Sequence, residues 1–166
     1  MGNLHSVQQA FRRLNQSLKI VREPNDLNEV KALVLPGVGS FDPAMDQLHQ
    51  TKLIPYLKSW VNENKPLLGI CLGLQLLFES SDEGDKEGLG LLKGHVHKLP
   101  SNQGERIPHM GWSLLNQKNE CPLLEKGEEK DNWMYFVHSY SAIPSDKSDL
   151  AASTKFGQDD VTAIVW

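Results

Sequence analysis

Short apolar runs separated by helical patterns fill the first half of the chain. Residues 31–37, KALVLPG, and residues 66–70, PLLGI, are mostly apolar, which is typical of strands buried on both faces of a sheet. Residues 18–22, LKIVR, have the composition of a further short strand. We therefore predict three strands in this half.

Between these strands, apolar residues recur at the spacing of one helix face. We predict a helix with Asn3 as its N-cap that runs to about Leu14, and a helical stretch over residues 43–64 that Pro55 splits or kinks. A further helix is expected over residues 72–80, directly after the third strand. The alternation of strand and helix indicates a parallel, right-handed, doubly wound sheet.

The pattern changes after residue 80. The apolar stretches become short and β-rich, and Gly, Pro and Asn separate them. We expect these stretches to add antiparallel strands to the parallel sheet. The predicted fold class is therefore α/β, with a doubly wound (flavodoxin-like), mostly parallel sheet and added antiparallel strands, in a single domain over residues 1–166.

Composition narrows the function classes. The 166 residues carry a formal net charge of -4, which argues against a nucleic-acid or anionic-membrane surface. No apolar stretch reaches the roughly 18 residues needed to span a bilayer. The two cysteines have no CxxC partner, and His95 with His97 does not complete a metal ligand set, so no metal and no cofactor are expected. A reducing cytoplasm is the compartment this cysteine content favours.

Residues 66–78, PLLGICLGLQLLF, place a cysteine between two glycines where a buried strand turns into a helix. Gly69, Cys71 and Gly73 match the nucleophile elbow, with sulfur in place of a hydroxyl. The position at a helix N-terminus favours a thiolate, and the Leu72 N–H points where an oxyanion forms. A lone cysteine is more often a small buried hydrophobe, but the paired glycines and flanking elements favour chemistry.

A second glycine motif, LPGVGSF over residues 35–41, follows the other buried strand. Ligand crevices in open α/β sheets form at such strand ends. Gly37 and Gly39 allow a backbone N–H to face the site, and Gly39 is the expected second oxyanion donor. Taken alone, this motif predicts only a turn.

Four motifs together resemble the class I (triad-type) glutamine amidotransferases: GICLGLQLLFE, LPGVGSFDPAM, PHMGW and YFVHSY. More narrowly, the chain is similar to the glutaminase subunits of imidazole glycerol phosphate synthase in histidine biosynthesis. The cysteine elbow marks the superfamily, whereas PHMGW and FVHSY select the subfamily. The resemblance covers essentially the whole chain.

The resemblance implies hydrolysis of glutamine to glutamate and transfer of the ammonia to a (β/α)8-barrel cyclase subunit, in a heterodimer. Cys71 matches the nucleophile, and Gly39 and Leu72 match the oxyanion donors. The positions that match glutamine-binding residues are Gln75, His138, Ser139 and Tyr140. The positions that match the contact with the barrel partner are His109, Met110 and Trp112.

The chain departs from the family pattern at both ends. The family supplies a proton-accepting histidine and its carboxylate from a His-Pro-Glu motif, which these 166 residues lack. The family's first strand, which would precede Gly2, is also missing. We therefore expect a truncated, incomplete domain whose glutaminase activity is low or absent. His138 has no Asp or Glu within two residues, so we name no base.

The sequence alone leaves three alternatives open. The chain could be another class I amidotransferase, such as the pyridoxal-phosphate glutaminase or a fused synthase domain, although PHMGW and FVHSY disfavour this. A non-catalytic subunit that only binds the barrel partner would explain the missing His-Pro-Glu. A cysteine hydrolase or esterase on a related fold would leave PHMGW unexplained.

Overall fold

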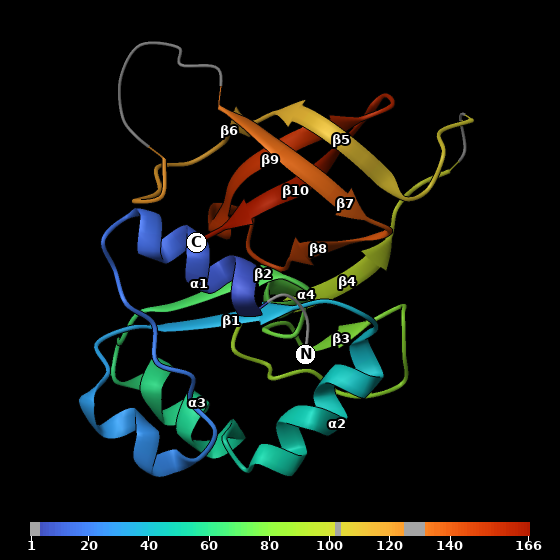
Figure 1. Ribbon diagram of the computed structural model, residues 1–166. Helices are drawn as coiled ribbons and strands as arrows, with labels where there is room; N and C mark the ends of the chain where they lie inside the picture. The colour runs from blue at the N-terminus through green and yellow to red at the C-terminus, as the bar shows by residue number, and fades with distance from the viewer. Residues whose placement is uncertain (1–3, 102–103, 125–131) are drawn as a thin grey trace. The chain divides into compact units, whose positions relative to one another are not determined.

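The computed structural model describes residues 4–101, 104–124 and 132–166, which form two compact units (Figure 1). The first unit extends to Leu92 and the second begins at Lys93. Helices and parallel strands make up the first unit, whereas antiparallel strands dominate the second. The predicted change of pattern along the chain is therefore present, close to residue 92 rather than residue 80.

Two parallel strands form the sheet of the first unit. β1 (Leu33–Gly37) pairs with β2 (Leu67–Cys71), in a register that sets Leu33 opposite Leu67 and Gly37 opposite Cys71. Both strands follow the apolar runs predicted for them. Their last residues carry the two glycine motifs, so these motifs meet at the same edge of the sheet.

Helices flank these strands in sequence. They are α1 (Leu4–Arg13), the 3-10 helix η1 (Pro24–Glu29), α2 (Phe41–Thr51) and α3 (Ile54–Asn62). α2 and α3 confirm the expected interruption of the 43–64 stretch: Lys52 has a left-handed φ of 58°, and Pro55 lies in the first turn of α3. The predicted N-cap Asn3 lies outside the described residues.

The strand predicted over residues 18–22 is wrong. Only Leu18 and Val21 are half-buried there, and a spacing of three residues does not place side chains on one face of a strand. The Arg22 N–H donates to the Asp26 carboxylate at 3.0 Å, which ties this segment to η1 instead of to a neighbouring strand.

The helix predicted over residues 72–80 is much shorter than expected. α4 spans only Leu72–Gln75, and the tighter Leu77 N to Leu74 O and Phe78 N to Gln75 O bonds follow it. The Leu76 carbonyl, which would accept the Ser80 N–H in the longer helix, instead accepts the Leu89 N–H at 2.9 Å, and a two-residue strand, β3 (Ser80–Ser81), comes next. Competing backbone partners therefore end the helix early.

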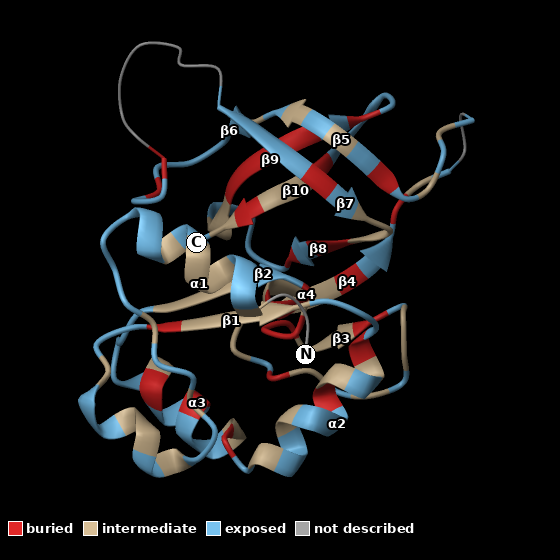
Figure 2. Cartoon of the chain, in the orientation of Figure 1, coloured by how far each residue is buried: buried red, intermediate tan, exposed pale blue. Residues whose placement is uncertain are grey.

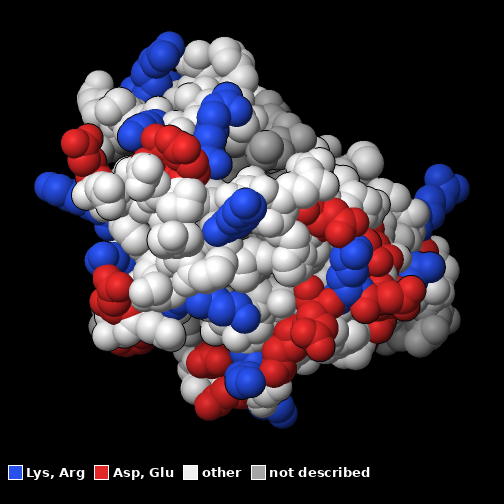
Figure 3. Space-filling model, turned by 90° about the horizontal axis from the view of Figure 1, so that it is seen from below, with Lys and Arg blue, Asp and Glu red and all other residues white. Residues whose placement is uncertain are grey.

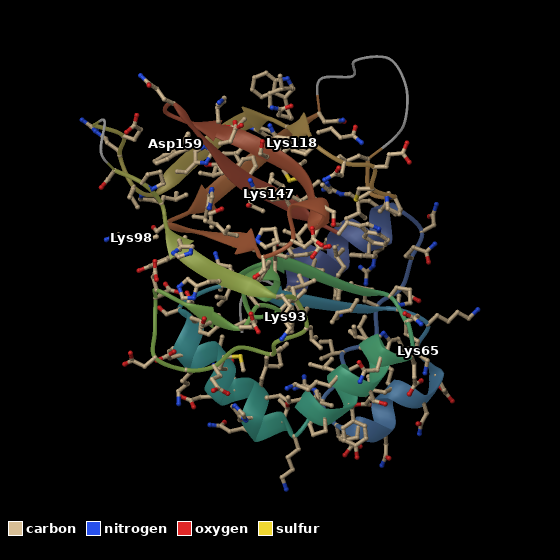
Figure 4. The ribbon with its side chains drawn as sticks, turned by 180° about the vertical axis from the view of Figure 1, so that it is seen from behind. Lys65, Lys93, Lys98, Lys118, Lys147 and Asp159 are labelled. Atoms are coloured by element: carbon tan, nitrogen blue, oxygen red, sulfur yellow. The ribbon has the colours of Figure 1, made fainter. Side chains whose placement is uncertain are left out.

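The core of the first unit lies between the β1–β2 pair and the helices (Figure 2). Phe41 and Met45 of α2 and Leu57 and Trp60 of α3 supply its helical side. The Trp60 indole donates from Nε1 to the Pro66 carbonyl at 2.9 Å, and the Lys65 ammonium lies 4.8 Å from the ring centroid (Lys65 is labelled in Figure 4). These contacts join the end of α3 to the start of β2.

Antiparallel pairs build the second unit. β4 (Gly94–Lys98) pairs with β8 (Tyr140–Pro144), and β5 (His109–Leu114) pairs with β7 (Trp133–His138). β9 (Leu150–Phe156) lies between β10 (Asp159–Val165) and the short β6 (Asn116–Gln117), and the 3-10 helix η2 (Lys147–Asp149) precedes it. The added antiparallel strands are therefore confirmed.

Two surface properties bear on the excluded functions. Within the described residues, none of the helices has the length and apolar character required to cross a membrane. On the face shown in Figure 3, Lys and Arg side chains are interspersed with Asp and Glu and do not gather into a basic patch. This face therefore lacks the electrostatic signature of a phosphate-backbone binder.

Candidate active site and apolar strand face

Cys71 occupies a strained backbone position at the junction of β2 and α4. Its φ of 56° and ψ of -118° lie in a region that L-residues other than glycine rarely adopt, and its side chain is exposed. Such strain costs about 1–3 kcal/mol and persists only where the surrounding structure enforces it. The strand–turn–helix geometry predicted for a nucleophile elbow is present here.

The glycines beside Cys71 are required by close backbone contacts. A Cβ at residue 69 would lie 2.7 Å from the Leu74 Cα, and a Cβ at residue 73 would run into the Leu35 carbonyl oxygen. The first contact lets α4 fold back over β2, and the second lets α4 pack on β1. The spacing G-x-C-x-G thus follows from the turn itself.

The PGVG loop begins beside the elbow. Gly37 faces Cys71 across the strand pair, and a Cβ at residue 37 would lie 3.0 Å from both the Gly73 nitrogen and the Leu72 Cβ. Gly39 has a φ of +100°, which L side chains rarely adopt, and among the described residues no heavy atom beyond its chain neighbours lies within 4 Å of its ideal Cβ position. The backbone here has the freedom that an oxyanion donor at Gly39 would need.

Gln75 is the last residue of α4, one helical turn from Cys71, and its side chain is half-buried. The structure therefore brings Gly39, Cys71, Leu72 and Gln75 together at the ends of two adjacent strands and the turn that follows. The other cysteine, Cys121, is free but buried in a small core with Leu124 and Ile164. The two thiols differ in exposure, as a reactive and a structural cysteine do.

The second unit brings together the remaining predicted residues around two histidines. His109 of β5 lies directly opposite His138 of β7, and their Nδ1 and Nε2 atoms are 3.0 Å apart. The His109 Nε2 lies 3.0 Å from the Ser113 hydroxyl, and the His138 Nδ1 lies 2.9 Å from the Tyr140 carbonyl oxygen. His109 is buried and stacks on Phe136 at a centroid distance of 5.0 Å.

These contacts fix the neutral tautomers. A carbonyl oxygen only accepts, so His138 carries its proton on Nδ1 and accepts at Nε2. His109 then donates from Nδ1 and accepts the Ser113 hydroxyl at Nε2. Desolvation by burial lowers the pKa of both histidines; the adjacent His138 lowers the pKa of His109 further, whereas the Tyr140 carbonyl partly raises that of His138. The pair therefore favours the uncharged state.

The opposite face of the β5–β7 pair is apolar and exposed. Period-two alternation puts Met110 opposite Val137, Trp112 opposite Tyr135 and Leu114 opposite Trp133. Trp112 is 67% exposed and meets the Tyr135 ring edge-on at 5.6 Å. We call these six residues the apolar strand face. Such a contiguous exposed apolar surface is typical of an interaction site.

Sequence reasoning found only part of this surface. Met110 and Trp112 were predicted, whereas Leu114, Trp133, Tyr135 and Val137 were not. The signal was available, because HMGWSL and WMYFVH each carry large apolar residues at every second position. The predicted contact residue His109 faces the other way, into the histidine pair.

Comparison with known proteins agrees with the motifs. The family "Glutamine amidotransferase class-I" matches residues 1–165. The chain is 69% identical over 166 residues to "Imidazole glycerol phosphate synthase subunit HisH 2" of Prochlorococcus marinus strain MIT 9313, covering 100% of this chain and 78% of that protein. It is 57% identical over 166 residues to "Imidazole glycerol phosphate synthase subunit HisH" of Synechococcus sp. strain CC9605, with the same coverage.

A solved structure shares the fold. The chain superimposes on a "Crystal structure of glutamine amidotransferase" with a TM-score of 0.70 and 18% identity, over 97% of this chain and 84% of that one. The predicted α/β class with parallel strands is thereby confirmed.

The chain therefore belongs to the class-I glutamine amidotransferase family. Within that family it groups with the glutaminase subunits of imidazole glycerol phosphate synthase, so the narrower resemblance is confirmed and the three alternative functions are not favoured.

Proposed function

We propose that Cys71 attacks the side-chain amide of glutamine and that the released ammonia passes to a (β/α)8-barrel cyclase subunit. The observation that carries this proposal is the exposed, strained Cys71 at the end of β2, with the PGVG loop beginning opposite it. Family membership supports the reaction class, and this geometry supports Cys71 as the nucleophile.

The proposed chemistry has two stages. The Cys71 sulfur forms a bond to the amide carbon, negative charge develops on the amide oxygen, and the C–N bond breaks as the nitrogen leaves as ammonia after taking up a proton. Water then attacks the thioester carbon, the C–S bond breaks, and glutamate and the thiolate are released. Backbone N–H groups of Gly39 and Leu72 stabilise the charged oxygen in both stages.

The glutamine-binding roles of Gln75, His138, Ser139 and Tyr140 remain part of the proposal. Gln75 lies one turn from Cys71, which supports its role. For the other three, support comes from the family resemblance.

The apolar strand face is the proposed docking surface for the barrel subunit. Trp112, Tyr135 and Trp133 supply large aromatic side chains, which interfaces use as binding anchors. The relatives of this chain are named as synthase subunits, which supports a heterodimer with the barrel subunit. We also propose that the protein resides in the cytoplasm, because a reducing compartment keeps cysteines such as Cys71 and Cys121 free.

Labelling with a glutamine-shaped chloromethyl ketone tests the proposal. We expect this reagent to modify Cys71 faster than iodoacetamide does, relative to their rates with a free thiol, and we expect glutamine to protect. Glutamate release measured with and without the barrel subunit then reports turnover. Labelling of Cys71 that glutamine does not slow would contradict a glutaminase site.

A further inference from the structure

The first turn of α2 is held by a carboxylate from far along the chain. The Phe41 N–H, the first in the helix, donates to the Glu83 carboxylate at 2.9 Å, across 42 residues of sequence. Ser40 occupies the N-cap position, yet its side chain makes no capping hydrogen bond. Local capping, which Ser commonly provides, is thus replaced by a remote acceptor.

A reciprocal contact fixes the segment that carries Glu83. The Asp42 carboxylate accepts the N–H groups of Asp85 and Lys86, each at 3.1 Å. A Cβ at residue 84 would run into the Asp42 carboxylate, so any larger residue there would require that carboxylate to move. We call this pair of contacts, Phe41–Glu83 and Asp42–Asp85/Lys86, the carboxylate clasp.

The clasp bears on the PGVG loop because Phe41 is the loop's far end. At the near end, Gly37 is fixed by its pairing with Cys71. At the far end, the Phe41 side chain is fully buried and its N–H is held by Glu83. Between them Val38 is 59% exposed, and no described residue other than its chain neighbours packs against the Cβ position of Gly39. The two ends, rather than packing around the loop, therefore determine where the Gly39 N–H lies.

We propose that Glu83 is a positioning residue for the oxyanion donor at Gly39. This inference rests on the proposed function, since it assumes that the Gly39 N–H stabilises charge during attack by Cys71. Hydrogen-bond donors act on a developing oxyanion only when they lie about 2.7–3.1 Å from it. Release of Phe41 lets the three residues between the fixed ends move, and the donor loses that alignment.

Two electrophiles separate positioning from other effects. With the glutamine-shaped chloromethyl ketone, sulfur bonds to the methylene carbon, chloride leaves, and charge develops transiently on the ketone oxygen. With iodoacetamide, sulfur displaces iodide without such charge. We expect Glu83→Ala to lower the maximal rate of Cys71 labelling by the ketone about 10-fold. The ketone concentration that gives the half-maximal rate should stay within about two-fold of wild type. The rate of labelling by iodoacetamide should also stay within about two-fold.

Matched variants complete the test. Glu83→Gln keeps an acceptor oxygen and is expected to retain most of the ketone rate. Asp42→Ala removes the reciprocal arm and is expected to slow the ketone reaction as Glu83→Ala does, and the double variant is expected to be no slower than the slower single variant. Asp46→Asn breaks only the exposed Lys86–Asp46 ion pair and serves as the control that leaves the rate unchanged.

Several results would overturn the inference. One is a maximal rate of Cys71 labelling by the ketone that is the same in Glu83→Ala as in wild type. Another is a change only in the ketone concentration that gives the half-maximal rate, because this would indicate that Glu83 contacts the substrate instead. Unfolding of Glu83→Ala would show as iodoacetamide labelling of the buried Cys121. In that case the maximal rate of ketone labelling in Asp42→Ala decides: an unchanged rate would overturn the inference. Failure of the proposed function looks different: wild type would then show no preference for the ketone, and both ideas would fall.

Discussion

The Leu35 carbonyl oxygen fills the space that a side chain at residue 73 would need. This contact lets α4 lie against β1 directly after the Cys71 turn. Neither strand could move away without breaking the register that pairs Leu35 with Gly69. The elbow therefore depends on a backbone-to-backbone approach.

Replacement of Gly73 by alanine tests that dependence. We expect Gly73→Ala to destabilise the fold by at least about 2 kcal/mol, because the new methyl group collides with backbone that cannot yield. Urea unfolding followed by circular dichroism measures the change. Ser40→Ala, at an exposed position without a side-chain cap, is the control and should stay within about 0.5 kcal/mol. Equal stability of both variants would refute the close approach.

Exposure of the two thiols predicts selective alkylation. A substoichiometric amount of iodoacetamide should modify Cys71 in the folded chain, because Cys121 is buried at 6% exposure. Peptide mapping by mass spectrometry identifies the site, and Cys71→Ser should abolish the fast phase. In urea both cysteines should react. Preferential labelling of Cys121 in the folded chain would show that the elbow is misassigned.

The histidine pair predicts a loss of stability in mild acid. Both pKa values lie below the ordinary value of 6.5, so above that pH both the folded and unfolded chains carry neutral rings. As the pH falls below about 6.5, the unfolded chain takes up protons that the folded chain does not, and the free energy of unfolding decreases.

Urea unfolding at a series of pH values measures this effect. His138→Asn removes one titrating ring and should flatten the decrease between about pH 6.5 and 5, whereas Gln50→Ala, at an exposed helix position, removes no titrating group and should leave the profile as in wild type. A wild-type profile that is flat across this range would contradict a neutral buried pair.

The apolar strand face predicts a localised binding defect. We expect Trp112→Ala to weaken association with the barrel subunit by about 2 kcal/mol, roughly 30-fold, because a large exposed aromatic anchor is lost. Tyr56→Ala removes a comparably exposed aromatic from α3 and should leave the affinity unchanged. Calorimetry measures both. Equal weakening by the two variants would place the interface elsewhere or indicate a general folding defect.

Local patterns predicted the parts of the fold whose causes are local. The apolar runs of β1 and β2, the break at Pro55 and the glycines around Cys71 each reflect backbone or packing requirements within a few residues. The strand predicted over residues 18–22 is absent because the capping contact of the Arg22 N–H with Asp26 outweighs the strand propensity of this segment. The helix predicted over residues 72–80 is shorter because the Leu76 carbonyl, which Ser80 would need, pairs with Leu89 of a later loop.

The features that the sequence did not predict depend on partners distant in sequence. In the sequence, Glu83 is one of several acidic residues in a loop, and only the structure shows that its carboxylate accepts the Phe41 N–H. His109 and His138 lie 29 residues apart, and only the β5–β7 register makes them neighbours. Spacing along one segment carries no information about such pairings.

The carboxylate clasp also has a consequence for biosynthesis. Cys71 leaves the ribosome before Glu83 and Asp85, and the Phe41 N–H has no acceptor in the clasp until those residues have been made. On the proposed roles, the Cys71 thiol is therefore present in the nascent chain before the clasp that aligns the Gly39 N–H can form. Reactivity toward amides would then arise only after residues 83–86 have been made, later than the thiol that carries it.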